Sequence, residues 1–161
     1  MIESKNDCQT LVLFRLAQQR YALRLDAVDR VIRAVAVTPV PETPAIVLGL
    51  INLAGQLLPV FSLRRCLGLP DRPIRPQDQF VIVRTSRLTV AMVVDEVRGL
   101  SRLDVTRTVA VEDALPQGEC RVQGLVKIEG EIILIYDLEK LFSRKDQERI
   151  LRAKEATENA N

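Results

Sequence analysis

The stretch Gly49-Leu-Ile-Asn-Leu-Ala-Gly-Gln-Leu-Leu-Pro-Val-Phe-Ser-Leu63 occurs a second time, in related form, as Gly124-Leu-Val-Lys-Ile-Glu-Gly-Glu-Ile-Ile-Leu-Ile-Tyr-Asp-Leu138. The two copies align without a gap, and most aligned pairs keep their apolar or polar character. In each copy two apolar runs flank a short turn signal, which is typical of a β-hairpin. The chain therefore contains an internal duplication built from β-hairpins.

The turn of each hairpin is predicted at Ala54-Gly55 and at Glu129-Gly130. Glycine in a tight turn supplies the positive φ that the favoured two-residue hairpin turns require. We assign structural turns to the four glycines of the two copies, Gly49, Gly55, Gly124 and Gly130.

The second strand of each hairpin, residues 56–63 and 131–138, is apolar at nearly every position. A strand with one face in water would alternate between apolar and polar residues. Both strands are therefore expected to be covered on both faces. Pro59 lacks an N–H for the ladder and is expected at a sheet edge or a bulge.

The rest of the chain repeats as well, because residues 9–15 resemble 78–84 and residues 21–28 resemble 90–97. Many short strands with turn signals favour an all-β protein of two small barrels. Each half is marginal in size, so the two should pack together and fold as one domain, 1–161. Its parts are a first barrel half (9–68), a Pro-rich linker (69–77), a second barrel half (78–142), and a C-terminal helix and tail (143–161).

The composition argues against several classes of protein. Net charge is only +2 and aromatic residues make up 4%, so neither a nucleic acid nor an anionic membrane is expected as the main partner. No apolar stretch reaches the roughly 20 residues of a membrane helix. Three cysteines, an odd number, fit a reducing compartment, and we interpret them as small core residues.

No signature of catalysis is present in the sequence. The chain has no histidine, which removes the commonest general base and metal ligand. A phosphate-binding loop and the G-x-S-x-G motif are also missing. We predict no enzyme activity, no cofactor and no metal.

Residues 41–64, from the Pro41-Glu-Thr-Pro44 loop to Arg64, resemble the CheW domain of bacterial chemotaxis adaptors. The family pattern is a proline, then G-[VIL]-x-N-[LI]-R-G, then an apolar segment with P-[VI]-x-D-L-R. Supporting matches lie at 21–26, 93–97 and 133–138, and the resemblance covers roughly residues 9–143. It implies two five-stranded, SH3-like barrels around a shared apolar core.

The resemblance also implies two partners. One is the regulatory domain of a CheA-type histidine kinase, and the other is the hairpin tip of a chemoreceptor, held in a groove between the barrels. To that groove we assign Val28, Arg30, Val31, Asn52, Ala54, Gly55, Leu58 and Val97.

Three positions depart from the family pattern. Ala54 stands where arginine is usual, and Arg30 stands where glutamate is usual. The resemblance implies that these two positions lie close together at the receptor-facing side. Losing both charges avoids a single unpaired charge, but alters the expected receptor surface. Ser62 replaces the usual aspartate, and we interpret it as a local cap.

Structural roles compete with functional ones at several positions. Val28 and Val31 could simply pack under the barrel, and Asn52 could bond the backbone of its own turn. Arg64 and Arg65 are expected on a solvated helix face. Asp26 and Asp95, which occupy equivalent places in the two halves, are expected in turns or caps rather than in chemistry.

The sequence therefore predicts a cytoplasmic scaffold, located at receptor arrays beneath the inner membrane, that couples a chemoreceptor to the kinase. The alternative is a divergent adaptor for a non-standard array, serving gliding or pilus motility, with altered receptor binding. The net charge of +2 and the 4% of aromatic residues argue against a small-barrel nucleic-acid binder, which would need a basic face with exposed aromatics. Exposed barrel edges make weak self-association a further expectation.

Overall fold

The structure is a computed structural model that describes residues 8–104, 122–141 and 144–159. In chain order the elements are β1 (Cys8–Leu16), β2 (Gln19–Arg24), the 3-10 turn η2 (Leu25–Ala27), β3 (Val28–Arg33), β4 (Val47–Leu53), β5 (Gln56–Ser62), α1 (Leu63–Leu67), β6 (Gln79–Arg84), β7 (Thr89–Val94), β8 (Glu96–Asp104), β9 (Val122–Ile128), β10 (Glu131–Tyr136), α2 (Leu138–Leu141) and α3 (Arg144–Asn159).

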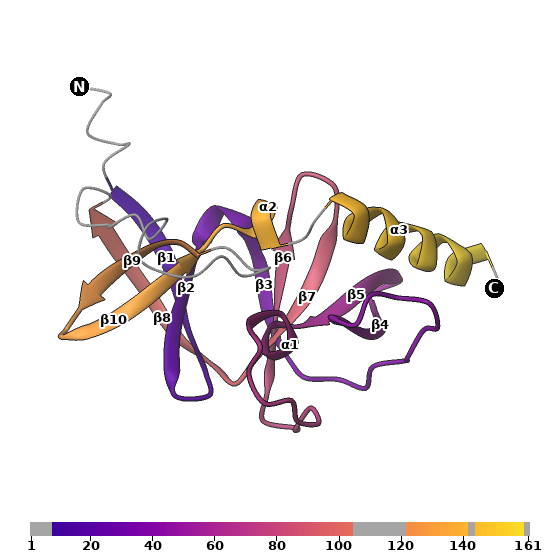
Figure 1. The fold of residues 1–161 in the computed structure, drawn as a ribbon, viewed down its shortest axis with the longest axis horizontal. Helices are drawn as coiled ribbons and strands as arrows, with labels where there is room; N and C mark the ends of the chain where they lie inside the picture. Colours follow the sequence, from indigo (N-terminus) through magenta and orange to yellow (C-terminus); the bar gives the residue numbers. More distant parts are fainter. Residues whose placement is uncertain (1–7, 105–121, 142–143, 160–161) are drawn as a thin grey trace.

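The strands form two five-stranded sheets, drawn side by side in Figure 1. The first sheet has the strand order β8-β1-β2-β10-β9, and the second has the order β3-β6-β7-β5-β4. The predicted fold class, an all-β protein of two packed five-stranded units with a C-terminal helix, is confirmed.

The sheets do not follow the two sequence halves. The first sheet joins β1 and β2 of the first half to β8, β9 and β10 of the second, whereas the second sheet takes β3 to β7. Two short parallel pairs, β10 with β2 and β5 with β7, join strands of different halves. The boundaries 9–68 and 78–142 are therefore boundaries of the sequence repeat and not of the sheets. Within the second half, residues 105–121 lie outside the described residues.

Buried apolar side chains form three clusters. The interior of the first sheet holds Leu11, Ala22, Leu103, Val126, Ile133 and Ile135. The interior of the second holds Ile51, Leu58, Val60, Phe80, Ile82 and Ala91. The third cluster, which we name the shared core, lies between the sheets and contains Phe14, Leu16, Tyr21, Leu23, Val47, Phe61, Leu63, Val81, Val83, Leu88, Val90, Met92, Val94, Tyr136, Leu138 and Ile150.

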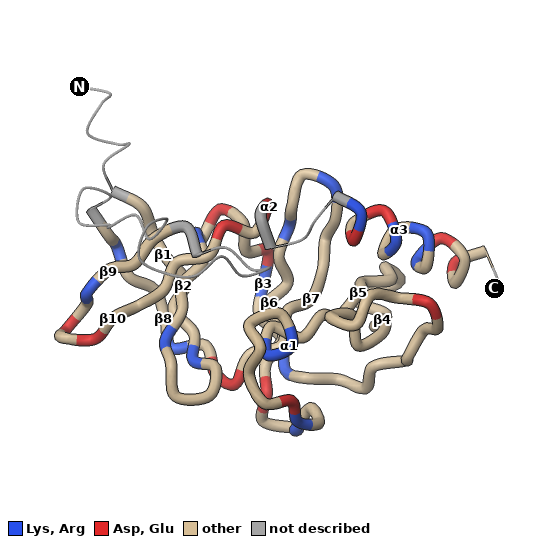
Figure 2. The backbone as a smooth tube through the Cα atoms, in the orientation of Figure 1, with Lys and Arg blue, Asp and Glu red and all other residues tan. Residues whose placement is uncertain are grey.

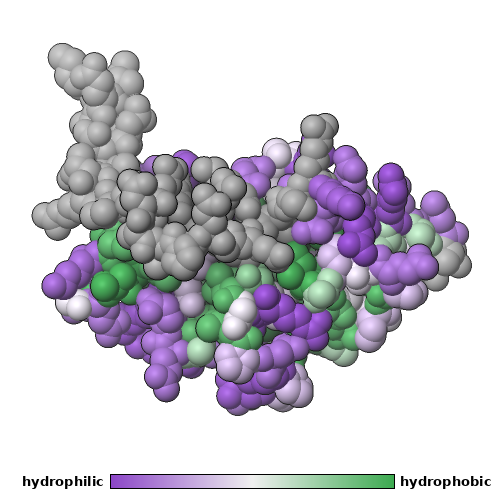
Figure 3. All heavy atoms as spheres, viewed as in Figure 1, coloured by the Kyte–Doolittle hydropathy of each residue, from purple (hydrophilic) through white to green (hydrophobic). Residues whose placement is uncertain are grey.

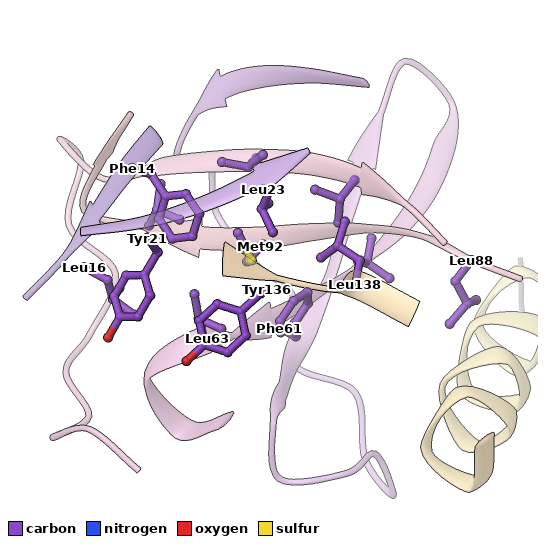
Figure 4. Close-up of a cluster of buried hydrophobic side chains, with 14 of the residues drawn as sticks. Phe14, Leu16, Tyr21, Leu23, Phe61, Leu63, Leu88, Met92, Tyr136 and Leu138 are labelled. Atoms are coloured by element: carbon purple, nitrogen blue, oxygen red, sulfur yellow. The ribbon is translucent and has the colours of Figure 1, made fainter. Parts of the chain in front are cut away.

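Aromatic rings organise the shared core. The ring of Tyr21 lies between those of Phe14 and Tyr136, at centroid distances of 5.7 and 5.6 Å. Figure 4 shows Tyr136 beside Phe61 of the second sheet and Leu63 of α1. The core thus draws side chains from both halves of the sequence and from both sheets.

The expectation of double-sided coverage holds for β5. Leu58 and Val60 point into the second sheet's interior, while Phe61 points into the shared core. In β10 the same expectation is only partly met, because the side chain of Ile132 is 56% exposed.

Pro59 lies neither at a sheet edge nor at the bulge. It is buried and pairs with Leu50 of β4. The missing N–H of Pro59 is also tolerated on the side of β5 that faces β7, because the pairing of β5 with β7 begins only at Val60.

The four glycines assigned to turns have two different roles. Gly55 and Gly130 lie in two-residue turns, with φ of 87° and 82°, and the residues before them also have positive φ. Gly49 and Gly124 lie within β4 and β9, so their assignment to turns is corrected. Each sits where the register of its hairpin shifts, which is the irregularity of a β-bulge.

The connection between the halves has no regular structure at residues 69–77, which form no helix or strand. Cys66 of α1 is disulfide-bonded, contrary to the interpretation of the cysteines as small core residues in a reducing compartment. Beyond the second half, α3 packs against β5 and places Ile150 in the shared core.

Gly49→Ala should destabilise the protein much more than Gly55→Ala. Both glycines have positive φ, but a Cβ at Gly49 would overlap the backbone carbonyl of Thr38, whereas Gly55 has open space. We expect a loss of roughly 1 kcal/mol for Gly55→Ala and roughly 3 kcal/mol or more for Gly49→Ala, measured by urea unfolding. Equal losses would contradict the bulge interpretation.

Candidate functional site

The chain passes between the two sheets at two points. It leaves the first sheet through η2 and enters β3, and it leaves the second sheet at Asp95 and enters β8. Val28 and Val97, which are equivalent in the sequence repeat, begin the edge strands after these crossings. Both are half-buried and pack against the shared core. The two crossings therefore lie beside the joint between the sheets.

Two further residues assigned to the receptor groove lie on β3. Val31 is 36% exposed, so part of its apolar side chain is available to a partner. Arg30 is exposed and pairs with its neighbour Asp29 at 3.3 Å. Val28 on the same strand fits both the packing and the receptor-contact interpretation, because it packs on the shared core and is still partly exposed.

Asn52, Ala54 and Gly55 form a unit of their own at the tip of the β4–β5 hairpin. The Oδ1 atom of Asn52 accepts a hydrogen bond from the N–H of Gly55 at 2.8 Å, which supports its role in stabilising the turn. Ala54 is exposed in the same turn. Since β3 and β4 are at opposite ends of the strand order, pairing within the sheet does not bring Ala54 next to Arg30.

Leu58 does not belong to a surface groove. Its side chain is fully buried in the interior of the second sheet. It points to the interior because the strand alternates there, with Val60 on the same side. The assignment of Leu58 to receptor binding is therefore corrected.

A group of charged residues at the joint is the main feature that the sequence did not predict. Asp95 and Asp78 are buried carboxylates, with side-chain exposures of 4% and 0%. They are joined by Arg64 of α1 and by Arg72 of the segment between the halves. We name these four residues the Asp95 cluster. Figure 2 shows acidic and basic segments close together around and below α1.

Asp95 accepts bonds from three separate segments. Arg64 donates from Nη2 to both carboxylate oxygens at 2.9 Å, and Arg72 donates to Oδ1 at 2.7 Å. The backbone N–H of Ala17, in the turn between β1 and β2, donates to Oδ2 at 2.8 Å. In addition, the N–H of Asp95 donates to the carbonyl of Arg15 at 3.0 Å. One residue thus ties α1, the inter-half segment and the β1–β2 hairpin together.

Asp78 completes the cluster at the entry to β6. Its Oδ2 accepts from Nη1 of Arg72 at 2.7 Å and from the N–H of Arg75 at 2.8 Å, and its Oδ1 accepts from Nη2 of Arg72 at 3.0 Å. The guanidinium of Arg72 therefore bridges the two buried carboxylates. Such charge-assisted, two-pronged contacts are among the stronger hydrogen bonds in proteins.

The surroundings hold both carboxylates ionised. Burial acts to raise the pKa of Asp95, but hydrogen bonds from Arg64 and Ala17, with the charges of Arg64 and Arg72, outweigh it and lower the pKa below 3.8. At Asp78 burial likewise acts to raise the pKa, but the hydrogen bonds from Arg72 and Arg75 outweigh it and lower the pKa. A buried charge with this many partners is satisfied rather than strained.

These findings correct the expectations for Arg64 and Asp95. The side chain of Arg64 is only 14% exposed, so it does not lie on a solvated helix face, while Arg65 is exposed and pairs with Asp71 at 2.8 Å. Asp26, the repeat equivalent of Asp95, is exposed and pairs with Arg24. The sequence repeat aligns Asp26 with Asp95 but does not indicate the arginine partners of Asp95, because these come from segments that differ between the halves.

An open groove of about 760 Å³ borders the cluster. Residues 34–37 form one wall, and residues 71–76 form the other, which includes Arg72. On the face shown in Figure 3, apolar and polar side chains are interspersed, with apolar patches in the middle of the molecule and at one end.

Within the described residues, no group of three or more His, Cys, Asp or Glu side chains could hold a metal ion. Nor is any described helix long and apolar enough to cross a membrane. Ser62 has the capping role predicted for it, since its Oγ accepts from the N–H of Arg65 at 3.2 Å.

The family model of the CheW-like domain matches residues 10–146, which include both sheets and the whole Asp95 cluster. The chain belongs to the CheW-like domain family. It is 32% identical to the Chemotaxis protein CheW of Thermotoga maritima over 80% of this chain and 83% of that one. It is 29% identical to Protein FrzA of Myxococcus xanthus over 89% of this chain and 91% of the relative.

The crystal structure of the scaffolding protein TtCheW from Thermoanaerobacter tengcongensis shares this fold. It superposes with a TM-score of 0.78, covers 86% of this chain and 94% of its own, and is 28% identical. The CheW-like fold implied by the resemblance of residues 41–64 is therefore confirmed by sequence and by structure.

Acid should destabilise the wild-type protein more than its Asp95→Asn variant. Because the folded-state pKa of Asp95 is lowered, its contribution is complete well above pH 3.8 and is lost as the pH falls through 3.8 toward the folded value. We expect Asp95→Asn to cost about 2–4 kcal/mol near neutral pH. The difference in unfolding free energy between the two proteins should narrow as the pH falls from about 5 through 3.8 in urea titrations. A gap that stays constant with pH would contradict this role for the carboxylate.

Proposed function

We propose that this CheW-like protein is a non-catalytic scaffold that couples a chemoreceptor to a CheA-type histidine kinase. The observation that carries the proposal is the CheW-like fold across both sheets, together with edge strands that begin at the joint between them. An adaptor needs two binding surfaces on one rigid body, and the shared core makes the two sheets one body.

The kinase partner is supported by the edges of the sheets. β3 and β8 are edge strands, and an edge strand presents N–H and C=O groups that can pair with another chain. Apolar side chains are exposed before and after β3, at Leu25 and Val35, with 39% and 48% exposure. A regulatory domain of similar barrel build would offer a matching edge and apolar contacts.

The receptor partner is supported by the residues at the two crossings. Val28 and Val97 combine packing on the shared core with partial exposure, which suits a groove floor between the sheets. Arg30 and Val31 continue the surface along β3. Asn52, Ala54 and Gly55 would contribute through the exposed tip of the β4–β5 hairpin.

We further propose that the protein acts in the cytoplasm, at receptor arrays beneath the inner membrane, without a cofactor. A second candidate is a divergent adaptor of a non-standard array, serving gliding or pilus motility. Ala54 and Arg30 favour it, since Ala54 lacks the usual positive charge and Arg30 reverses the usual negative one. The similarity to Protein FrzA, a relative with a name other than CheW, agrees with this alternative.

Calorimetric titration of the full chain with the kinase regulatory domain, and separately with a receptor hairpin tip, tests the proposal. Binding to both partners would establish the bridge. Binding to the kinase domain alone would favour the divergent adaptor, and binding to neither would overturn the functional proposal while leaving the fold intact.

Val31→Asp should weaken binding of the receptor tip by about tenfold or more, because it places a charge on an apolar contact surface. Ile132→Asp is the matched control, since Ile132 is also an exposed apolar strand residue but lies in the first sheet. Circular dichroism of both variants should match the wild type. Equal weakening by the two changes would argue against a receptor surface on β3.

The double change Ala54→Arg with Arg30→Glu should increase affinity for a receptor tip of the usual kind, because it restores the charges of the family pattern. Each single change serves as the control. If the double change leaves the affinity of the wild type unaltered, these two positions do not determine the choice of receptor.

A further inference from the structure

We propose that Asp95 is a positioning residue that, through Arg64 and Arg72, sets the orientation of the first sheet relative to the second. That this orientation shapes the receptor surface rests on the function proposed above. The positioning role itself rests only on the contacts of the Asp95 cluster.

Asp95 stands where the chain leaves the second sheet for the first. Its carboxylate accepts the N–H of Ala17, which belongs to the β1–β2 hairpin of the first sheet. The same carboxylate accepts hydrogen bonds from Arg64. Arg64 lies in α1, which begins directly after β5 of the second sheet. The carboxylate thus bonds to both sheets at once.

Arg72 extends this connection deeper into the second sheet. Its guanidinium contacts Asp95 at 2.7 Å and Asp78 at 2.7 Å, and Asp78 directly precedes β6. Next to Asp78, Gln79 accepts the N–H of Val97 through its Oε1 at 2.7 Å. The start of β8 is therefore held on both sides, by Asp95 and by Gln79.

The shared core explains why the sheets pack but not the angle at which they pack. Apolar burial is non-directional and depends mainly on area. Hydrogen bonds and ion pairs have defined distances and angles, and buried polar groups can specify one arrangement among several of similar packing. Among the described residues, Asp95 makes several of the directional contacts between the sheets, because it bonds to the N–H of Ala17 and the carbonyl of Arg15 and also pairs with the side chain of Arg15 at 3.5 Å. Others are the Gln79–Val97 bond and the bonds of Ser86 to Glu139.

The two crossings differ in this respect, although the repeat makes them equivalent. At the other crossing Asp26 has a side chain that is 67% exposed and pairs with Arg24 two residues away. That contact stays within one segment and contributes little at such exposure. Asp26 therefore provides a control of the same residue type at the equivalent position.

Residual dipolar couplings of backbone amides measure the relative orientation of the sheets directly. In the wild type and in Asp26→Asn, one alignment tensor should fit the amides of both sheets. In Asp95→Asn each sheet should still fit its own tensor, but the two frames should be rotated, or one sheet should show reduced order. A single tensor with the wild-type orientation in folded Asp95→Asn would overturn the proposal.

If Asp95→Asn does not fold, the Arg72→Gln variant tests the positioning role instead. This change leaves Arg64 on Asp95 and Arg75 on Asp78, so both carboxylates keep a basic partner. It should still rotate or loosen one sheet relative to the other. Retention of the wild-type orientation in Arg72→Gln would count against the proposal even if Asp95→Asn were unfolded.

Titration with the receptor tip separates this inference from the proposed function. If the orientation shapes the receptor surface, folded Asp95→Asn should bind the tip about tenfold more weakly than Asp26→Asn does. Rotated frames with unchanged affinity would confirm the positioning role and overturn its link to the receptor. Rotated frames in a protein whose wild type does not bind the tip would overturn the proposed function alone.

Discussion

Neither half of the sequence can complete a five-stranded sheet by itself, and the rest of the structure depends on this constraint. The first two strands of each repeat leave the remaining three and join the other repeat's strands, so that the parallel pairs β2–β10 and β5–β7 bring different halves together. The exchange forces the chain to cross between the sheets twice. It also places a large apolar surface between them, where Tyr21 stacks on Phe14 and lies tilted against Tyr136.

The features that local patterns determine could be predicted from the sequence. The repeated hairpins, the turns at Gly55 and Gly130, and the C-terminal helix follow from periodicity and from the conformational freedom of glycine. Gly49 was misassigned because the approach of the Thr38 backbone, which excludes a side chain, arises from tertiary structure. Leu58 was misassigned because a strand apolar on both faces does not reveal which face meets a partner.

The exchange of strands and the Asp95 cluster could not be predicted for a related reason. A repeat shows which segments are alike but not which of them pair, and Asp95 is 31 residues from Arg64 and 23 residues from Arg72 in the sequence. Their association also breaks the symmetry of the duplication, since Asp26 has no comparable environment. The two halves thus share a backbone plan, while the polar contacts at the joint distinguish one side of the protein from the other.

The strand exchange also determines the order in which the protein can be completed during synthesis. The second sheet, β3 to β7, needs only residues up to Val94, so it can close before the C-terminal strands exist. The β1–β2 hairpin is made first, yet its neighbours β8 and β10 are made last. Until β8 and β10 are synthesised, both edges of the hairpin stay unpaired, and the equivalent strands of a second nascent chain could pair with them instead. A domain-swapped dimer with intact second sheets is the assembly error to which this topology is most exposed.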